Sequence, residues 1–195
     1  MLEWMLSPAL RRAGRLARDE SGATALEFAI LALPFFTLVF AILETSLIFF
    51  SGQILDSATQ DASRLVRTGQ AQAASFTVGN FRSAVCDRLY GLFDCNQLKI
   101  NVAVVSDFTS ATAPYPMQTG AECTTSGSTT NCDWKLGDQF QPGEGGQVVL
   151  VQVYYKWPTV IKLPGFNFQD QPDGTRLLGA VRVFRNEPFG CSGCT

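Results

Sequence analysis

One apolar run of 23 residues, positions 28–50, constrains this chain more than any other feature of its sequence. It reads FAILALPFFTLVFAILETSLIFF, and fifteen of these residues are Leu, Ile, Val or Phe. As a helix it would be about 34 Å long, against about 30 Å for the hydrocarbon core of a bilayer. The run therefore predicts one membrane-spanning helix. Its one acid, Glu44, lies toward the end, where a charge costs less than at the bilayer centre. We expect that carboxylate at headgroup level, although it could also pair with a partner helix.

The charges on either side of the run predict its orientation. The segment before it carries Arg11, Arg12, Arg15 and Arg18, whereas residues 51–63 contain neither Lys nor Arg. Positive flanks of membrane helices stay in the cytoplasm, so residues 51–195 are expected across the membrane. The run is longer than the apolar region of a cleaved secretory signal, and no A-x-A-like site follows it. An uncleaved signal anchor remains open as an alternative.

All six cysteines follow the apolar run, and their number is even. An oxidising periplasm would allow three disulfides, and the spacing favours the local pairs Cys86–Cys95, Cys123–Cys132 and Cys191–Cys194. Sequence alone leaves the other pairings possible. A zinc site is less consistent with the spacing, because only one C-x-x-C occurs.

Composition argues against most catalytic and nucleic-acid functions. The chain has no histidine, which excludes histidine-based triads, dyads, and histidine-ligated zinc or haem. Its net charge of −2 argues against a nucleic-acid partner. We therefore expect no enzymatic activity, no cofactor and no metal.

Hydrophobic periodicity predicts an α+β fold. The spanning helix should begin at 21–24 and continue as an amphipathic helix to Gly69, where glycine is a plausible stop. A short helix is expected at 80–90. Alternating apolar residues predict strands at 98–105, 147–157 and 176–186, forming a small antiparallel sheet packed on the long helix.

The expected organisation has three parts. Residues 1–22 would be a basic cytoplasmic leader, 23–72 a transmembrane helix with a periplasmic extension, and 73–195 a periplasmic domain. Within that domain, 106–131 is rich in Ser and Thr and reads as a long surface loop. Pro34 removes a backbone donor inside the span and is expected to kink the helix.

Three smaller features have structural interpretations. Tyr154, Tyr155 and Trp157 could form a binding patch, but aromatic residues in a strand more often pack in the core or against neighbouring strands. The glycine-rich 143–146 and the acidic 170–173 have the composition of turns, not of phosphate or calcium sites.

The segment before the span carries a possible processing motif. Gly22 precedes the helix, and Glu27 is the fifth residue after it. Glycine lets a backbone lie extended and close to a protease, and an acid in an apolar helix requires a partner in lipid. The alternative is that these residues only begin a helix and have no role in processing, because 24–27 also match the capping box S/T-x-x-E.

The stretch SGATALEFAILALPFFTLVFAILE, followed by Ala58, Ala62, Arg64 and the break at Gly69, resembles the TadE-like family. These are minor pilins or pseudopilins of the tight-adherence (Flp) pilus system. The closing VFRNEPF at 183–189 also looks like this family. The resemblance covers roughly a third of the chain, at its two ends.

The resemblance implies a structural role in the bacterial inner membrane. A prepilin peptidase would cut this class III signal between Gly22 and Ala23, and Glu27 would pair with the new amine of a neighbouring subunit. The implied partners are that peptidase, pilin and pseudopilin subunits, the inner-membrane assembly machinery and membrane lipid. Ala23 departs from classical type IV pilins, which often have Phe there. The competing function is a permanently anchored periplasmic binding or adhesion module, which needs neither Gly22 nor Glu27.

Overall fold

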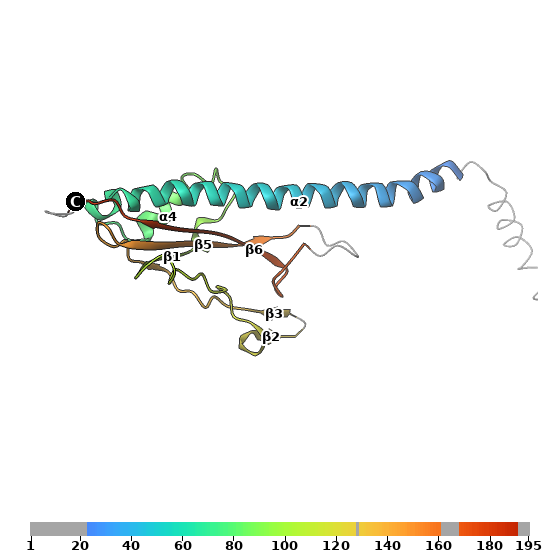
Figure 1. Ribbon diagram of the computed structural model, residues 1–195. Helices are drawn as coiled ribbons and strands as arrows, with labels where there is room; N and C mark the ends of the chain where they lie inside the picture. The colour runs from blue at the N-terminus through green and yellow to red at the C-terminus, as the bar shows by residue number, and fades with distance from the viewer. Residues whose placement is uncertain (1–22, 128, 161–167, 191–195) are drawn as a thin grey trace, which may run out of the picture. The chain divides into compact units, whose positions relative to one another are not determined.

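The computed structural model describes residues 23–127, 129–160 and 168–190 (Figure 1). The chain divides into two compact units. One unit ends at Leu43 and the other begins at Glu44. The helices are α2 (Ala23–Arg67), α3 (Gln70–Ala73) and α4 (Val78–Cys86), with 3-10 turns η2 (Cys95–Gln97) and η3 (Gly120–Glu122). The strands are β1 (Lys99–Val105), β2 (Thr124–Ser126), β3 (Thr129–Asn131), β4 (Gln139–Phe140), β5 (Val148–Pro158) and β6 (Thr175–Arg185).

Helix α2 is continuous from Ala23 to Arg67, as the periodicity predicted. It ends where expected, because Gly69 takes a φ of +78°, a conformation that favours glycine. Among the residues that the structure describes, α2 is the one helix long and apolar enough to cross a membrane. Pro34 lies inside it, and the kink expected there stays a prediction.

The main sheet has the order β4-β1-β5-β6. Strand β5 pairs antiparallel with both β1 and β6, so the three predicted strands form an antiparallel sheet. The two-residue β4 adds an edge that runs parallel to β1, which makes the whole sheet mixed. A two-residue strand is too short to show an alternating pattern, so the sequence does not predict it.

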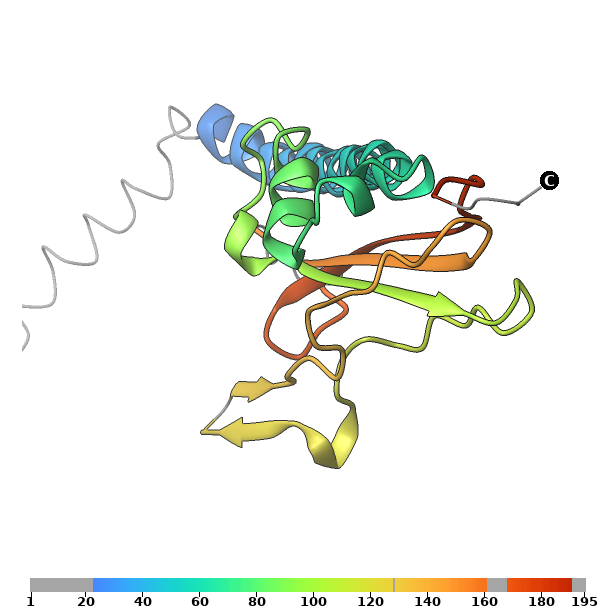
Figure 2. The same ribbon diagram turned by 90° about the vertical axis from the view of Figure 1, so that its left-hand side faces the viewer.

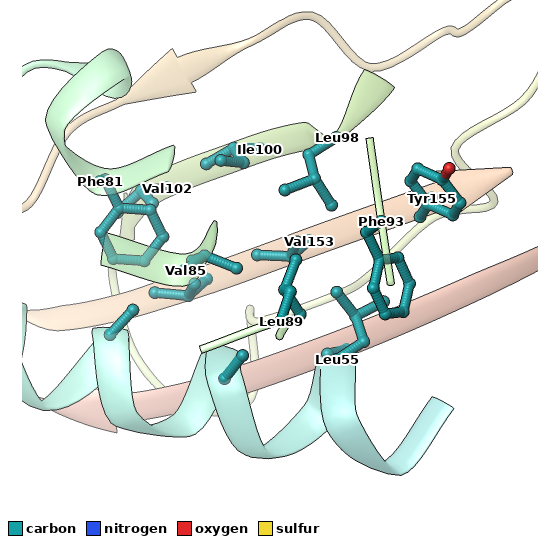
Figure 3. Close-up of a cluster of buried hydrophobic side chains, with 14 of the residues drawn as sticks. Leu55, Phe81, Val85, Leu89, Phe93, Leu98, Ile100, Val102, Val153 and Tyr155 are labelled. Carbon is teal, nitrogen blue, oxygen red and sulfur yellow. The ribbon is translucent and has the colours of Figure 1, made fainter. Parts of the chain in front are cut away.

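Helices α2 and α4 cover one face of this sheet, and the core lies between them (Figures 2 and 3). Leu55, Ala58 and Ala62 from α2 are buried in one cluster with Phe81 and Val85 from α4 and with alternate residues of β1 and β5. Alanines on the helix face let α2 approach the sheet closely. The expected packing of the long helix on the sheet is confirmed.

The segment 106–131 is not one long loop. It contains the hairpin β2–β3, which lies on the side of the sheet opposite α2 and α4 (Figure 2). Strand β5 is buried on both faces from Val148 to Tyr155, although the sequence predicted one mixed face. Tyr154 and Tyr155 are both buried, and the Tyr155 ring lies 4.9 Å from that of Phe93. The packing interpretation of these aromatic residues is confirmed.

Candidate functional site

The candidate site is the first part of α2, residues 24–43, whose large apolar side chains are mostly exposed. Phe28 is 69% exposed and Leu33 is 72% exposed. A soluble protein rarely exposes so large a continuous apolar surface, because each such side chain costs about 1.5–3 kcal/mol relative to burial. This segment is therefore suited to contact lipid or the apolar helices of other subunits.

Glu27 lies on this exposed segment, one helical turn after Ala23, the first residue of α2. Its side chain is exposed between Leu26 and Phe28, and it forms no ion pair with any described residue. A carboxylate in lipid is costly unless a cation or donor pairs with it. In an apolar environment the carboxylate would therefore need a partner beyond the residues that the structure describes. Gly22, the other half of the predicted motif, lies outside the described residues.

Glu44 has a different environment from Glu27, and its expected position at headgroup level stays a prediction. Its side chain is only 2% exposed, and one carboxylate oxygen accepts a hydrogen bond of 3.0 Å from the backbone N–H of Val160. The acid thus ties α2 to the segment that follows β5. Hydropathy along the chain contains no sign of this contact, because the two residues are 116 positions apart.

The end of α2 is held by the chain that follows β6. The carbonyl of Arg67 accepts a hydrogen bond of 2.9 Å from the N–H of Glu187. The ring of Phe189 lies directly over Gly69, where a Cβ would come within 2.5 Å of it. Buried Asn186 donates to the carbonyls of Pro142 and Glu144. The resemblance noted at 183–189 therefore falls on the segment that closes the domain around α2.

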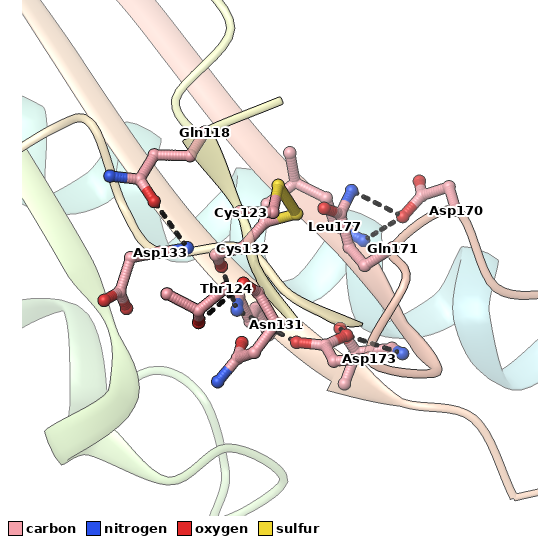
Figure 4. Close-up of polar contacts among 12 residues, drawn as sticks. Gln118, Cys123, Thr124, Asn131, Cys132, Asp133, Asp170, Gln171, Asp173 and Leu177 are labelled. Carbon is pink, nitrogen blue, oxygen red and sulfur yellow. Dashed lines mark hydrogen bonds and ion pairs between the residues drawn. A yellow bond between two sulfur atoms is a disulfide. The ribbon is translucent and has the colours of Figure 1, made fainter. Parts of the chain in front are cut away.

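Two disulfides stabilise the domain. Cys86 joins Cys95 and thereby links α4 to the turn before β1, and Cys123 joins Cys132 across the hairpin (Figure 4). These are two of the three local pairs that the spacing favours. Cys191 and Cys194 lie outside the described residues. Among the residues that are described, no cluster of three or more His, Cys, Asp or Glu side chains could hold a metal ion.

Lys156 connects the hairpin to the main sheet. Its ammonium group donates to the carbonyl of Cys132 and to the carboxylate of Asp173, both at 2.9 Å. Burial would raise the pKa of Asp173, but hydrogen bonds from Thr175 and Lys156 outweigh it and hold that pKa below its ordinary value. The acidic turn thus has a structural role, as its composition predicted.

The lowered pKa of Asp173 predicts a pH-dependent contribution to stability. A depressed pKa stabilises the fold above the unfolded value, about 3.9, and the contribution is lost as pH falls through the folded value. Asp173→Asn should lower the melting temperature at pH 7 by about 2–4 °C, the equivalent of about 1 kcal/mol. This deficit should shrink as the pH falls below about 4. Circular dichroism melts of the full chain in mild detergent, from neutral to acid pH, measure it. A deficit that is the same at every pH would contradict this assignment.

These features describe a chain in which a lipid-compatible helix segment continues into a disulfide-stabilised α+β domain. Residues 22–64 match the family model described as TadE-like protein, which agrees with the resemblance of this segment. The match covers less than a quarter of the chain and associates it with the tight-adherence pilus system. It stops before the closing segment, whose resemblance stays a prediction. No curated protein and no solved structure matches the chain significantly.

Proposed function

We propose that this protein is a minor pilin or pseudopilin that takes part in assembly of a tight-adherence pilus. The observation that carries the proposal is the overlap of the family match with the exposed apolar helix. The TadE-like match, residues 22–64, includes the part of α2 in which Phe28 and Leu33 are largely exposed. The matched segment thus contains an apolar surface that is suited to pack against lipid or against other helices.

The precursor would be a single-pass inner-membrane protein with its arginine-containing leader in the cytoplasm and its domain in the periplasm. The distribution of Lys and Arg on the two sides of the apolar run supports this orientation. Both disulfides described lie in the part assigned to the periplasm, where an oxidising environment maintains such bonds.

A prepilin peptidase would then cut between Gly22 and Ala23. The cut removes the leader and leaves a cationic amine at the start of α2. Glu27, exposed and without a described ion-pair partner, would pair with the amine of an adjacent pilin or pseudopilin subunit. The pair neutralises both charges within the apolar layer and sets the register between subunits. The domain would present its surface to the assembly machinery in the periplasm.

The test is the intact mass and amino-terminal sequence of the protein extracted from membranes of cells with a working prepilin peptidase. We expect a mature chain that begins at Ala23. Gly22→Ala should abolish this processing, because the added methyl group interferes with close approach of the backbone to the peptidase. Gly52→Ala, a glycine replacement farther along α2, is the matched control and should be processed normally.

A full-length chain in the wild type would contradict the processed-pilin mechanism. It would favour the other function, a permanently anchored periplasmic module with binding or adhesion activity. Processing that persists unchanged in Gly22→Ala would place the cut elsewhere and remove the role assigned to this glycine.

A further inference from the structure

Strand β6 forms one edge of the main sheet, because β5 is its one neighbour among the described strands. Just beyond β6, the N–H of Asn186 donates to the carbonyl of Gln147 at 2.9 Å, in the register that pairs Val148 with Arg185. Bonded residues recur at every second position of an antiparallel pair, so the even-numbered residues of β6 bond to β5. The odd-numbered residues direct their N–H and C=O groups to the outer edge of the sheet.

The chain itself covers the first part of this outer edge. The N–H of Leu177 donates to the carboxylate of Asp170 at 2.8 Å. The carbonyl of Thr175 accepts a hydrogen bond of 3.0 Å from the N–H of Gln171. An acidic turn therefore supplies partners for the outward groups at the start of β6.

The second part of the edge, around Val183, borders a basic groove of about 390 Å³ between β6 and the last turns of α2. Three arginines line this groove, Arg64 and Arg67 from α2 and Arg182 from β6, and no acid is among the described residues that line it. All of these residues belong to the unit that begins at Glu44. The groove is thus a feature of the domain by itself.

The three arginines differ in how fully they are paired. Arg182 contacts Asp56, whereas Arg67 lies 3.5 Å from Glu187 in a pair that is about half exposed. Arg64 forms no ion pair with any described residue. An exposed ion pair contributes little, so the guanidinium of Arg67 remains available to a second carboxylate. The groove should therefore attract negative charge, although the whole chain has a net charge of −2.

Ser63 also belongs to the lining of the groove. It is only 4% exposed, and its hydroxyl has no hydrogen-bond partner among the described residues. By contrast, the hydroxyls of Thr59 and Thr68 on the same helix each donate to the carbonyl four residues earlier. The lining thus contains an unused hydroxyl donor beside the guanidinium donors, and a carboxylate supplies acceptors for both kinds.

We propose that this groove binds an extended acidic segment of another protein, which adds to the sheet beside Val183 as a further strand. The backbone of that segment bonds to the outward N–H and C=O of Val183, the mode of recognition called β-strand addition. Side chains alternate along a strand, so every second residue of the segment faces the groove and brings a carboxylate to Arg64 and Arg67. Asp170 already serves as acceptor for Leu177 on the same edge. This site goes beyond the proposed function and does not depend on it.

The experiment titrates a rhodamine-labelled peptide with the full chain in mild detergent and follows fluorescence anisotropy. The peptide has about eight residues, a common strand length, in which threonine and glutamate alternate. A second peptide has glutamine in place of glutamate. Two further peptides carry N-methyl groups on alternate amides, one on the threonines and the other on the glutamates. Only one of these two sets of amides can face β6, because N–H groups alternate between the two edges of a strand.

We expect saturable binding of the acidic peptide, with a Kd below about 1 mM. Arg64→Ala should weaken it on the order of tenfold, because the substitution removes a charge-assisted hydrogen bond. Arg88→Ala is the matched control, since it removes the same charge from a pair with Asp61 that lies outside this groove, and it should bind normally. One N-methylated peptide should lose binding and the other should keep it.

Four results would overturn the proposal. They are the absence of saturation at about 1 mM, equal binding of the glutamine peptide, equal effects of the two arginine substitutions, and equal binding of the two N-methylated peptides. Inorganic phosphate serves as the competitor. If phosphate binds as tightly as the acidic peptide, the groove is a site for small anions and no strand is added to β6.

Discussion

Glu27→Ala is expected to leave the protein in the membrane and to remove it from assembled pili. Deleting the acid makes insertion of α2 more favourable, by at most about 2.5–3.5 kcal/mol, the cost of a charge at the bilayer centre. The same change leaves the amine of a neighbouring subunit without its counter-charge in an apolar layer. Breaking such a buried pair costs about 3–5 kcal/mol, which corresponds to a loss of association of at least a hundredfold. The ratio of protein in shear-released filaments to protein in membranes measures the effect.

Two further variants separate charge from shape and position. Glu27→Gln keeps the size of the side chain and should be as defective as the alanine variant, because the charge is what the amine requires. Thr37→Val is the matched control, since Thr37 is another exposed polar residue of the span, and its hydroxyl only donates to the Leu33 carbonyl of its own helix. It should assemble normally. If Glu27→Ala accumulates in filaments as Thr37→Val does, Glu27 has no role in pairing.

The two parts of the motif should also be coupled. Without cleavage after Gly22 there is no amine at Ala23 for a carboxylate to meet. Gly22→Ala and Glu27→Ala should therefore have similar assembly defects, and the double variant should be no worse than either alone. Independent functions would instead give additive losses.

Periodicity predicted the elements whose side chains pack in the core. Helix α2 and the long strands β5 and β6 were found because burial of a face imposes a repeat on the sequence. The hairpin β2–β3 was missed because its residues are mostly exposed Ser and Thr with no apolar repeat. It is held by the Cys123–Cys132 bridge and by Lys156. A turn glycine, Gly127, between two threonine-containing stretches bounded by cysteines was the available sign.

The candidate site was only partly predictable for a similar reason. Glu27 could be proposed from sequence because the features that single it out, an apolar helix and a preceding glycine, are its neighbours along the chain. The environment of Glu44 depends on Val160, which the fold brings to it from beyond β5. An apolar run measured along the sequence cannot separate residues that face lipid from residues that face the protein's own core. The run at 28–50 therefore contains both.

Gly69→Ala is expected to destabilise the domain strongly, because Gly69 closes the fold at the end of α2. Its φ of +78° costs a residue with a Cβ about 1–2 kcal/mol. The new Cβ would also come within 2.5 Å of the Phe189 ring, which would have to move. Together these effects should reach about 2–3 kcal/mol, or on the order of 5–10 °C in melting temperature.

Gly52→Ala is the matched control for this experiment. Gly52 lies inside α2, and no atom lies within 4 Å of the position that its Cβ would take. It should raise stability by up to about 1 kcal/mol, because alanine is the better helix former.

The double variant Gly69→Ala/Phe189→Ala removes the clash but keeps the backbone strain, so its loss of stability relative to Phe189→Ala alone should fall to about 1–2 kcal/mol. A Gly69→Ala protein that melts at or above the wild-type temperature would show that Phe189 does not lie over this turn, and that the segment after β6 does not hold the end of α2.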